Sequence, residues 1–401
     1  MKEIYDKIFD ICTEKGIDFY CTLPCSHNIT LIQKLEELDG RVLKEGAKPL
    51  IHIPLVREES GVSLCAGAYL GGRKTAMIIQ NQGLGNMVTL MLSVNSNLNG
   101  SYNIPNLLII SHRGMEGEKI PAQKPLGIKT EEILDLVGFR YCSVSDINEL
   151  GEFLSLLDEY NHGESVALLV KPKYDSPPYR IDAKIQRSRT LRENIIRKKK
   201  IITEMSRYKA ISTIMQFVTD ELVVTNLGHP SRELNHIRDR DRNFYLTSCL
   251  GHSYTLALGL ALGLEDTDQK IICFEGDGAL LMNPGSLAIL SNKKPKNLIL
   301  ILLDNGVWGS TGNTTNYAMN NVNLSAVIQS FGFPNSLIKT VSNEVELAER
   351  FKNVLENKGP FIIHALINDI YEKVPVLPFS VIEIKERFVK SILKDRLNNG
   401  N

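Results

Sequence analysis

The sequence predicts an α/β fold made of two doubly wound parallel-sheet domains. Short apolar runs alternate with helical patterns in both halves, and a polar stretch from Tyr174 to about Arg197 separates the halves. Such alternation is typical of parallel sheets, because a parallel connection needs a crossover that is usually a helix. The expected domains are residues 1–173 and 205–382, with a linker over 174–204 and a helical tail over 383–401.

Short apolar runs bounded by turn residues mark the expected strands. In the first half the expected strands are Phe19–Leu23, Ile51–Val56, Ala76–Gln80, Leu107–Ser111 and Val166–Lys171. In the second half they are Leu222–Thr225, Ile271–Phe274, Leu298–Leu303 and Phe361–Ala365. No sequence repeat is visible, but the common alternation indicates that the halves can share an architecture.

The composition is that of a globular protein without a strong electrostatic field. Hydrophobic residues make up 43% and charged residues 23%, and Lys plus Arg equals Asp plus Glu at 46 each. This balance argues against nucleic acid or an anionic membrane as a partner. The start, MKEIYDKIFDICTEKG, resembles a charged amphipathic helix rather than a signal peptide, so we expect a cytoplasmic protein. Seven scattered cysteines without a C-x-x-C pair favour reduced thiols.

A carboxylate stands between two glycines at the end of one expected strand. In IICFEGDGALLMNPG, Asp277 follows the strand and precedes an expected helix over Leu280–Leu290, and Asn305 follows the next strand. Because parallel strands end at one sheet edge, the two side chains should share a ligand there. Their oxygens suit Mg²⁺, and the adjacent glycines allow phosphates to approach the backbone. A tight turn whose aspartate caps a helix is the alternative, which Asn305 makes less favoured.

The Gly-Asp-Gly sequence with its following asparagine resembles the cofactor motif of thiamine-diphosphate-dependent enzymes. The resemblance implies a thiamine diphosphate whose Mg²⁺ is held by Asp277, Asn305 and the backbone oxygen of Val307. It also implies that the cofactor contacts the residues around the aspartate, namely Gly276, Gly278 and Ala279.

A second resemblance concerns the glutamate that such enzymes place against the aminopyrimidine ring. The segment IHIPLVREESGVSLCAGAYLGGRK resembles the pyrimidine-binding domain of the family, and the alignment puts Glu58 at the catalytic position, with Glu59 one residue away. Alternatively, either glutamate merely stabilises the first turn of a helix. QNQGLGN resembles the loop near the pyrimidine ring, which implies cofactor contacts by Gln82 and Gly83.

The opening of the second half resembles the diphosphate-binding domain. TNLGHPSREL and SCLGHSYTLALGLALG carry this resemblance, which implies cofactor contacts by Gly228 and Gly251. Leu250 stands where the family has a bulky apolar residue that supports a bent cofactor, although an ordinary core leucine is the alternative. His252 is either a phosphate contact or a polar turn residue.

Four stretches, LPC, HIPLVREESGVSLCAGAYLGG, ISHRG with EKIPAQ, and DNGVWGSTGN, narrow the resemblance within the family. They resemble sulfopyruvate decarboxylases, whose alpha and beta subunits look fused in this chain, with phosphonopyruvate decarboxylases close behind. The length leaves no room for a middle domain, and Cys25 stands where phosphonopyruvate decarboxylases are expected to have an acidic residue. The resemblance implies decarboxylation of 3-sulfopyruvate to sulfoacetaldehyde and carbon dioxide, of the coenzyme M biosynthesis type, or the corresponding reaction of phosphonopyruvate. A carboligase and a catalytically silent thiamine-diphosphate-binding protein remain alternatives.

The expected substrate is a 2-keto acid with a terminal sulfonate or phosphonate, so a second anion must be bound. Candidates in the first half are His27, His112, Arg113 and Lys119. Arg113 is favoured because a guanidinium can bind two oxygens at once, and a structural ion pair is the alternative. We expect His112 and Arg113 to join Glu58 in catalysis. The resemblance also implies a homodimer or higher oligomer with active sites at the subunit interface.

Overall fold

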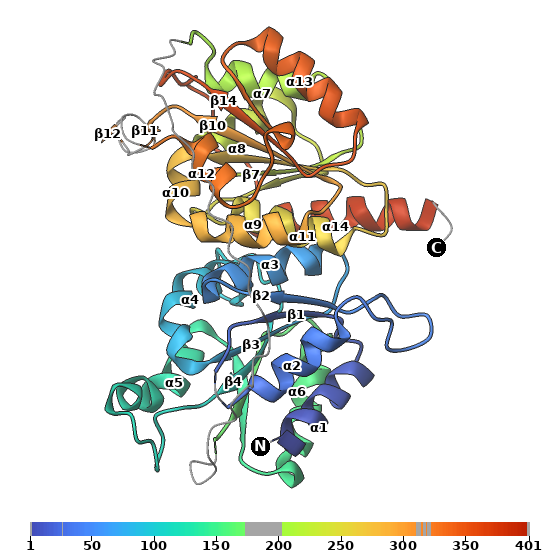
Figure 1. Cartoon of the computed structure of the whole chain (residues 1–401), viewed down its shortest axis with the longest axis vertical. Coiled ribbons are helices and arrows are strands. Elements are labelled where there is room, and N and C mark those ends of the chain that lie inside the picture. Colours follow the sequence, from blue (N-terminus) through green and yellow to red (C-terminus); the bar gives the residue numbers. More distant parts are fainter. Residues whose placement is uncertain are drawn as a thin grey trace.

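Two six-stranded parallel sheets, one in each half of the chain, form the computed structural model (Figure 1), which describes residues 2–25, 27–172, 203–309, 314–315, 318 and 322–398. The sheet orders are β2-β1-β3-β4-β6-β5 and β13-β14-β10-β9-β7-β8. If the strands are numbered 1 to 6 along each half, the two orders are 2-1-3-4-6-5 and 5-6-4-3-1-2. The second order is the first one reversed. The predicted α/β fold with two doubly wound parallel sheets is confirmed, and the halves share one topology.

The first sheet uses strands from residues 19–170 and the second uses strands from residues 222–366. The strands of the first sheet are β1 (Phe19–Thr22), β2 (Ile51–Pro54), β3 (Thr75–Gln80), β4 (Leu107–Ser111), β5 (Arg140–Val144) and β6 (Val166–Val170). Those of the second are β7 (Leu222–Thr225), β8 (Asn243–Tyr245), β9 (Ile271–Gly276), β10 (Leu298–Asp304), β13 (Ile338–Val341) and β14 (Phe361–Leu366). A short antiparallel ribbon, β11 (Val307–Trp308) with β12 (Thr314–Thr315), follows β10.

Helices cover both faces of each sheet, as expected for crossover connections. Those of the first half are α1 (Lys2–Glu14), α2 (Ile29–Leu38), α3 (Glu58–Leu70), α4 (Leu84–Leu90), α5 (Lys124–Val137) and α6 (Gly151–Asn161). Those of the second half are α7 (Arg207–Met215), α8 (His229–Arg238), α9 (Ser253–Gly263), α10 (Asp277–Met282), α11 (Leu287–Lys293), α12 (Leu324–Ser330), α13 (Glu344–Glu356) and α14 (Val381–Asn398). The expected linker over 174–204 lies almost entirely outside the described residues.

Two expectations about local structure need correction. The sequence does not reveal β5, β8 and β13, which are all edge strands. Edge strands are partly solvated, so β13 for example has exposed residues between its buried ends and no continuous apolar run. The single helix expected over Leu280–Leu290 is two helices, α10 and α11, because Pro284 cannot continue the first helix.

The two halves are joined by α3 and α9, which occupy equivalent positions in the two topologies. Both helices are apolar around nearly their whole circumference, as expected of helices buried on all sides. Glycines let the helices approach closely, since a Cβ at Gly67 would collide with the Leu256 carbonyl and one at Gly259 with the Leu64 carbonyl. The two sheets therefore share one apolar core that runs through this interface.

Gly67→Ala is expected to destabilise the protein, because its new methyl group meets backbone that cannot rotate away. Overpacking of this kind costs about 1–3 kcal/mol of unfolding free energy. Gly151→Ala in α6 is the matched control, since nothing lies within 4 Å of its added methyl group. Chemical denaturation of both variants measures the difference, and equal stability would contradict the close helix approach.

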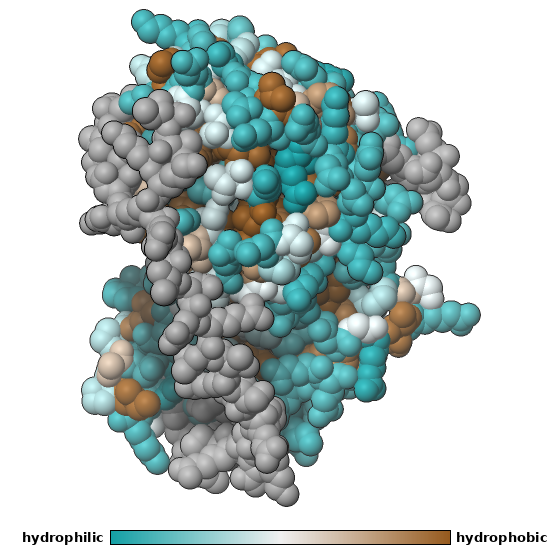
Figure 2. Space-filling model, turned by 45° about the horizontal axis from the view of Figure 1, so that its top comes forward, coloured by the Kyte–Doolittle hydropathy of each residue, from teal (hydrophilic) through white to brown (hydrophobic). Residues whose placement is uncertain are grey.

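The C-terminal helix α14 and the outer surface complete the fold. The predicted helical tail is present over Val381–Asn398, where Phe388 packs edge-on against Phe244 at the β8 edge. The face in Figure 2 is largely hydrophilic, with small hydrophobic patches. Among the described residues, no helix combines the length and apolarity that crossing a bilayer requires. All seven cysteines are free and buried, which agrees with the expected reduced thiols.

Candidate active site

A cavity of about 100 Å³ opens at the carboxyl ends of β9 and β10 in the second half. Seven of the predicted cofactor residues line it: Leu250, Gly276, Asp277, Gly278, Ala279, Asn305 and Val307. A cavity of this size is smaller than the roughly 300 Å³ or more of usual small-molecule sites. It is therefore too small for a whole cofactor molecule.

Asp277 joins the two loops that follow β9 and β10. Its carboxylate accepts hydrogen bonds from the backbone N–H of Gly278 at 2.8 Å and of Gly306 at 2.7 Å. Because Gly306 directly follows Asn305, the carboxylate lies beside the predicted second metal ligand. The Asn305 side-chain oxygen accepts a hydrogen bond from the Val307 N–H at 3.2 Å. The two residues thus lie at the ends of adjacent strands.

The donor set fits a divalent cation with a diphosphate. Asp277 and Asn305 present hard oxygen atoms, and a Mg²⁺ ion bound by few protein oxygens keeps positions for phosphate oxygens. A Cβ at Gly278 would overlap the Trp308 ring unless that ring moved, so glycine here lets the two loops lie close together. Among the described residues, no group of three His, Cys, Asp or Glu side chains could hold a metal ion, so a metal here needs the amide and backbone oxygens.

Glu275 anchors the aspartate loop from within the core. It is fully buried and accepts hydrogen bonds from the Ser253 hydroxyl at 2.6 Å and the Tyr254 N–H at 3.2 Å. Burial raises the pKa of Glu275 to about 7, although these hydrogen bonds oppose the rise. The end of β9 is thereby fixed to the beginning of α9.

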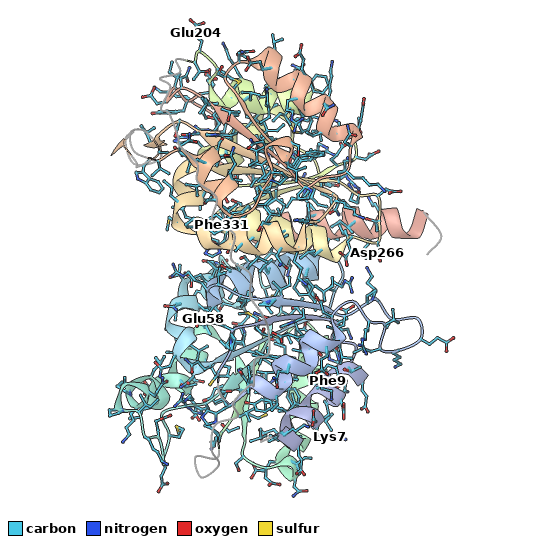
Figure 3. The ribbon with its side chains drawn as sticks, in the orientation of Figure 1. Lys7, Phe9, Glu58, Glu204, Asp266 and Phe331 are labelled. Atoms are coloured by element: carbon cyan, nitrogen blue, oxygen red, sulfur yellow. The ribbon has the colours of Figure 1, made fainter. Side chains whose placement is uncertain are left out.

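Glu58 is the first residue of α3 and lies at the corresponding edge of the first half (Figure 3). Only 8% of the residue is exposed, and its carboxylate accepts a hydrogen bond from the Asn86 amide at 3.1 Å. Its carboxyl group also packs against Gly83, where an added Cβ would overlap it. Gln82, the neighbouring predicted cofactor residue, donates from its side-chain amide to the Gln123 carbonyl at 3.0 Å.

Gly83→Ala is expected to lower activity at least about tenfold, because misplacing a reacting group by about 1 Å costs up to 10²-fold. The new methyl group would displace the Glu58 carboxyl, which is a flexible side chain, so the fold should survive. Gly85→Ala is the control, since its methyl group meets nothing within 4 Å. Steady-state kinetics and thermal unfolding of both variants check this, and full activity of Gly83→Ala would refute it.

Hydrogen bonds across the halves connect the Glu58 region to the cavity. The Ser60 hydroxyl contacts the Asn283 side-chain oxygen at 3.3 Å and the Ser286 hydroxyl at 2.8 Å. The Asn283 amide donates to the Gly251 carbonyl at 3.2 Å, directly beside Leu250. Within one chain, the start of α3 therefore lies close to the start of α9. In Figure 1, α10 and β11 lie on the same side of the molecule as the start of α3.

His252 and Gly228 occupy different places at this edge. His252 is buried between the halves, where its Nδ1 lies 3.3 Å from the Ser63 hydroxyl, and it does not line the cavity. Burial, together with nearby Arg57, lowers the pKa of His252 to about 4, so it is neutral at pH 7. Gly228 has a φ of +83° and begins the turn into α8.

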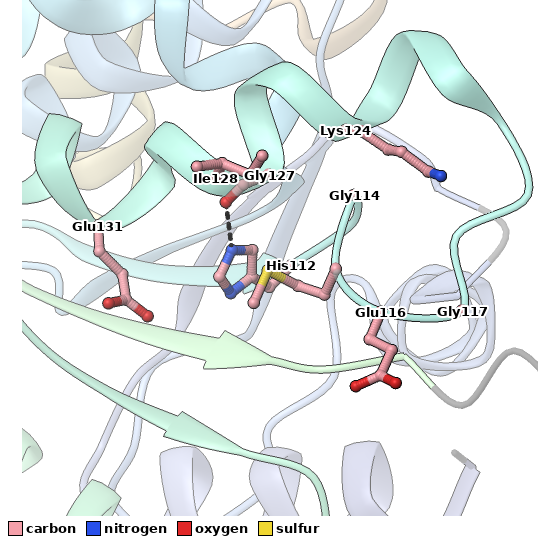
Figure 4. A pocket seen from close by; sticks show the side chains of 9 residues that line it. His112, Gly114, Glu116, Gly117, Lys124, Gly127, Ile128 and Glu131 are labelled. Carbon is pink, nitrogen blue, oxygen red and sulfur yellow. Dashed lines mark hydrogen bonds between the residues drawn. The ribbon is translucent and has the colours of Figure 1, made fainter.

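Arg113 and His112, the expected partners of Glu58, have other contacts. Arg113 forms a two-pronged ion pair with Glu118, at 3.0 Å from Nε and 2.9 Å from Nη2. The Arg113 guanidinium is therefore already paired with a carboxylate. His112 is 1% exposed and donates from Nε2 to the Gly127 carbonyl at 2.9 Å. It lies in a separate cavity of about 580 Å³ between the loop after β4 and α5 (Figure 4).

Two basic residues that the sequence did not predict, Arg207 and His229, also line the cavity. Arg207 lines the cavity while forming a buried two-pronged ion pair with Glu233, with both contacts at 2.9 Å. His229 lines it and stacks on Tyr371 at 4.7 Å between ring centroids. Burial and the charge of Arg207 lower the pKa of His229. His229 lies within TNLGHPSREL, so the sequence offered a reason to consider it. Nothing in the local sequence distinguishes Arg207.

Comparisons with known proteins agree with this architecture. A family model described as "Thiamine pyrophosphate enzyme, C-terminal TPP binding domain" matches residues 228–365. The chain is 34% identical over 398 residues to the sulfopyruvate decarboxylase of Methanosarcina acetivorans, covering 96% of this chain and 97% of that protein. It is 29% identical over 362 residues to the phosphonopyruvate decarboxylase of Streptomyces viridochromogenes, covering 88% and 86%.

Separate subunits and a solved structure also match. The alpha and beta subunits of sulfopyruvate decarboxylase from Methanococcus maripaludis are 37% identical over 171 residues and 38% identical over 195 residues. The alpha alignment covers 42% of this chain and 95% of the subunit, and the beta alignment covers 48% of this chain and 100% of the subunit. The crystal structure of benzoylformate decarboxylase from Polynucleobacter necessarius superposes with a TM-score of 0.67 at 12% identity, covering 92% of this chain and 99% of that one. The chain belongs to the thiamine-diphosphate-dependent decarboxylase family and is a carboxy-lyase.

Proposed function

We propose that this chain decarboxylates 3-sulfopyruvate to sulfoacetaldehyde and carbon dioxide, using thiamine diphosphate and Mg²⁺. The observation that carries the cofactor assignment is the hydrogen bond from the Gly306 N–H to Asp277 at 2.7 Å, which brings both predicted metal-binding loops together. The full-length similarity to a sulfopyruvate decarboxylase supports the substrate assignment, since it exceeds the similarity to a phosphonopyruvate decarboxylase.

The roles of the chain's own residues follow from their positions. Bound thiamine diphosphate supplies the electron sink that makes loss of carbon dioxide from a 2-keto acid possible. Asp277, Asn305 and the Val307 carbonyl would hold Mg²⁺ and, through it, the diphosphate. Glu58 would exchange a proton with the aminopyrimidine ring through its carboxyl group. Leu250, which lines the cavity beside the bridge between the halves, would support the cofactor where it passes from one half to the other.

Charge at the edge of the first half favours a sulfonate over a phosphonate. A sulfonate carries one negative charge, whereas a phosphonate resembles a phosphate with about 1.5 to 2 charges near pH 7. Arg113 is offset by Glu118. Burial, and for His27 also the charge of Arg113, lowers the pKa values of His27 and His112, so both are neutral at pH 7. With Arg113 paired and both histidines neutral, these three candidates suit a singly charged group better than a doubly charged one.

Parallel assays of sulfopyruvate, phosphonopyruvate and pyruvate with thiamine diphosphate and Mg²⁺ test the substrate. We expect the highest kcat/KM for sulfopyruvate and an aldehyde as the only organic product. Preference for phosphonopyruvate would replace the proposed substrate, a ligated keto product would indicate a carboligase, and no turnover of any substrate would favour a silent binding protein.

We further propose that the active protein is a homodimer or higher oligomer with shared sites, as the family resemblance implies. Contacts within one chain already place the start of α3 beside the cavity edge, so the chain that supplies Glu58 to each site needs a direct test. Inactive Glu58→Gln and Asp277→Ala proteins can be mixed after reversible dissociation. Restored activity is expected for shared sites, and a mixture that stays inactive would assign Glu58 and the cavity to one chain.

A further inference from the structure

One histidine links the two ends of the segment that carries the predicted metal ligand Asn305. His364 lies on β14 with its side chain buried. Its Nε2 is 2.7 Å from the Asp304 carboxylate, and its Nδ1 is 2.7 Å from the Ser325 hydroxyl. Asp304 is the last residue of β10 and directly precedes Asn305, while Ser325 lies in the first turn of α12.

The donors and acceptors of these two hydrogen bonds can be assigned from the chemistry of the partners. A carboxylate only accepts, so Nε2 of His364 donates to Asp304, and in the neutral ring Nδ1 accepts from the Ser325 hydroxyl. The Ser325 oxygen also lies 2.9 Å from the Thr340 hydroxyl of β13. Hydrogen bonds therefore run from Asp304 through His364 and Ser325 to Thr340. They connect strands β14 and β13 to the residues on either side of the segment 305–324.

The segment that follows Asp304 begins with residues of the candidate active site. Asn305, Val307 and Trp308 line the cavity, and the N–H of Gly306 holds the Asp277 carboxylate. A shift at Asp304 would move its neighbours Asn305 and Gly306, and hence both predicted side-chain ligands. His364 lies outside the sequence motifs that predicted the metal ligands, so the link is an observation independent of them.

We propose that His364 is a positioning residue for the diphosphate and metal site, acting through Asp304 and Ser325. The proposal rests on the proposed function, since it assigns a support to that same site. Residues that orient metal ligands typically change metal affinity or activity by about 10- to 100-fold when they are replaced.

Trp308 provides a readout that does not depend on turnover. It is the only tryptophan, it lines the cavity, and its ring lies against Gly278. Its fluorescence should therefore respond to Mg²⁺ added with saturating thiamine diphosphate. We would titrate Mg²⁺ into the wild type, His364→Leu, His364→Gln, Ser325→Ala and the surface control His236→Gln, and measure thermal unfolding without ligands.

We expect His364→Leu to raise the half-saturating Mg²⁺ concentration about 10- to 100-fold. His364→Gln, which can keep a donor toward Asp304, should recover part of the loss, and Ser325→Ala should give a smaller shift in the same direction. His236→Gln should match the wild type. If His364→Leu does not fold, Ser325→Ala and His364→Gln carry the test.

A lowered unfolding temperature with unchanged half-saturation in these variants would overturn the positioning role, because a purely structural histidine predicts that pattern. Failure of the proposed function has a different signature. In that case the wild type itself would show no Mg²⁺-dependent response, and Asp277→Ala would behave like the wild type.

Discussion

Glu58→Gln is expected to reduce decarboxylation by about 10²- to 10⁴-fold, the usual contribution of a positioned proton-transfer group. The amide has the size of the carboxyl group and can still contact Asn86, but it cannot exchange a proton with the cofactor ring. Thiamine diphosphate binding should therefore survive. Carbon dioxide release measures the first effect, and calorimetric titration with the cofactor measures the second.

Glu59→Gln is the matched control, because the sequence left open which glutamate is catalytic. Glu59 forms an ion pair with Arg57 at 2.5 Å, whereas Glu58 packs on Gly83 of the predicted pyrimidine loop. We expect Glu59→Gln to retain most activity. The assignment would be reversed by a fully active Glu58→Gln protein together with an inactive Glu59→Gln protein.

Asp277→Ala is expected to abolish Mg²⁺-dependent binding of thiamine diphosphate, with the apparent affinity falling more than about 100-fold, beyond the usual loss for a supporting residue. The substitution removes one predicted ligand and frees the backbone N–H groups of Gly278 and Gly306, so the second loop loses its anchor. Calorimetric titration with thiamine diphosphate, with and without Mg²⁺, checks this.

Two further proteins make that titration interpretable. Asp266→Ala removes a carboxylate that is about half exposed and pairs with Lys48, far from the predicted ligands in sequence, so it should bind the cofactor normally. Asp277→Asn keeps an oxygen that can accept from Gly306 and should show an intermediate loss. Wild-type affinity in Asp277→Ala would exclude this carboxylate as a metal ligand.

The sequence predicted the central strands well because they are buried on both faces and read as continuous apolar runs. Asp277 and Asn305 were predictable for a related reason, since both directly follow such strands and strand ends meet at one edge. The edge strand β8, by contrast, carries no long apolar run, and its pairing with β7 depends on tertiary structure.

The remaining features depend on side-chain contacts that form only in the folded chain. Arg113 offered a suitable anion ligand, but Glu118 on the same loop pairs with it, and only the folded loop reveals that pair. The pair of Arg207 with Glu233 and the link from His364 to Asp304 join different elements in the same way. Local patterns therefore placed the predicted metal ligands at the strand ends, whereas the contacts that surround them became visible only in the structure.

A crystal structure of the protein with thiamine diphosphate and Mg²⁺ tests the central claim most directly. We predict one Mg²⁺ ion about 2.0–2.1 Å from oxygens of Asp277, Asn305 and the Val307 carbonyl, with the diphosphate in the cavity beside them. We also predict a Glu58 carboxyl within hydrogen-bonding distance of the aminopyrimidine ring. A metal bound without Asp277 and Asn305, or a ring that meets no glutamate at position 58, would contradict the account.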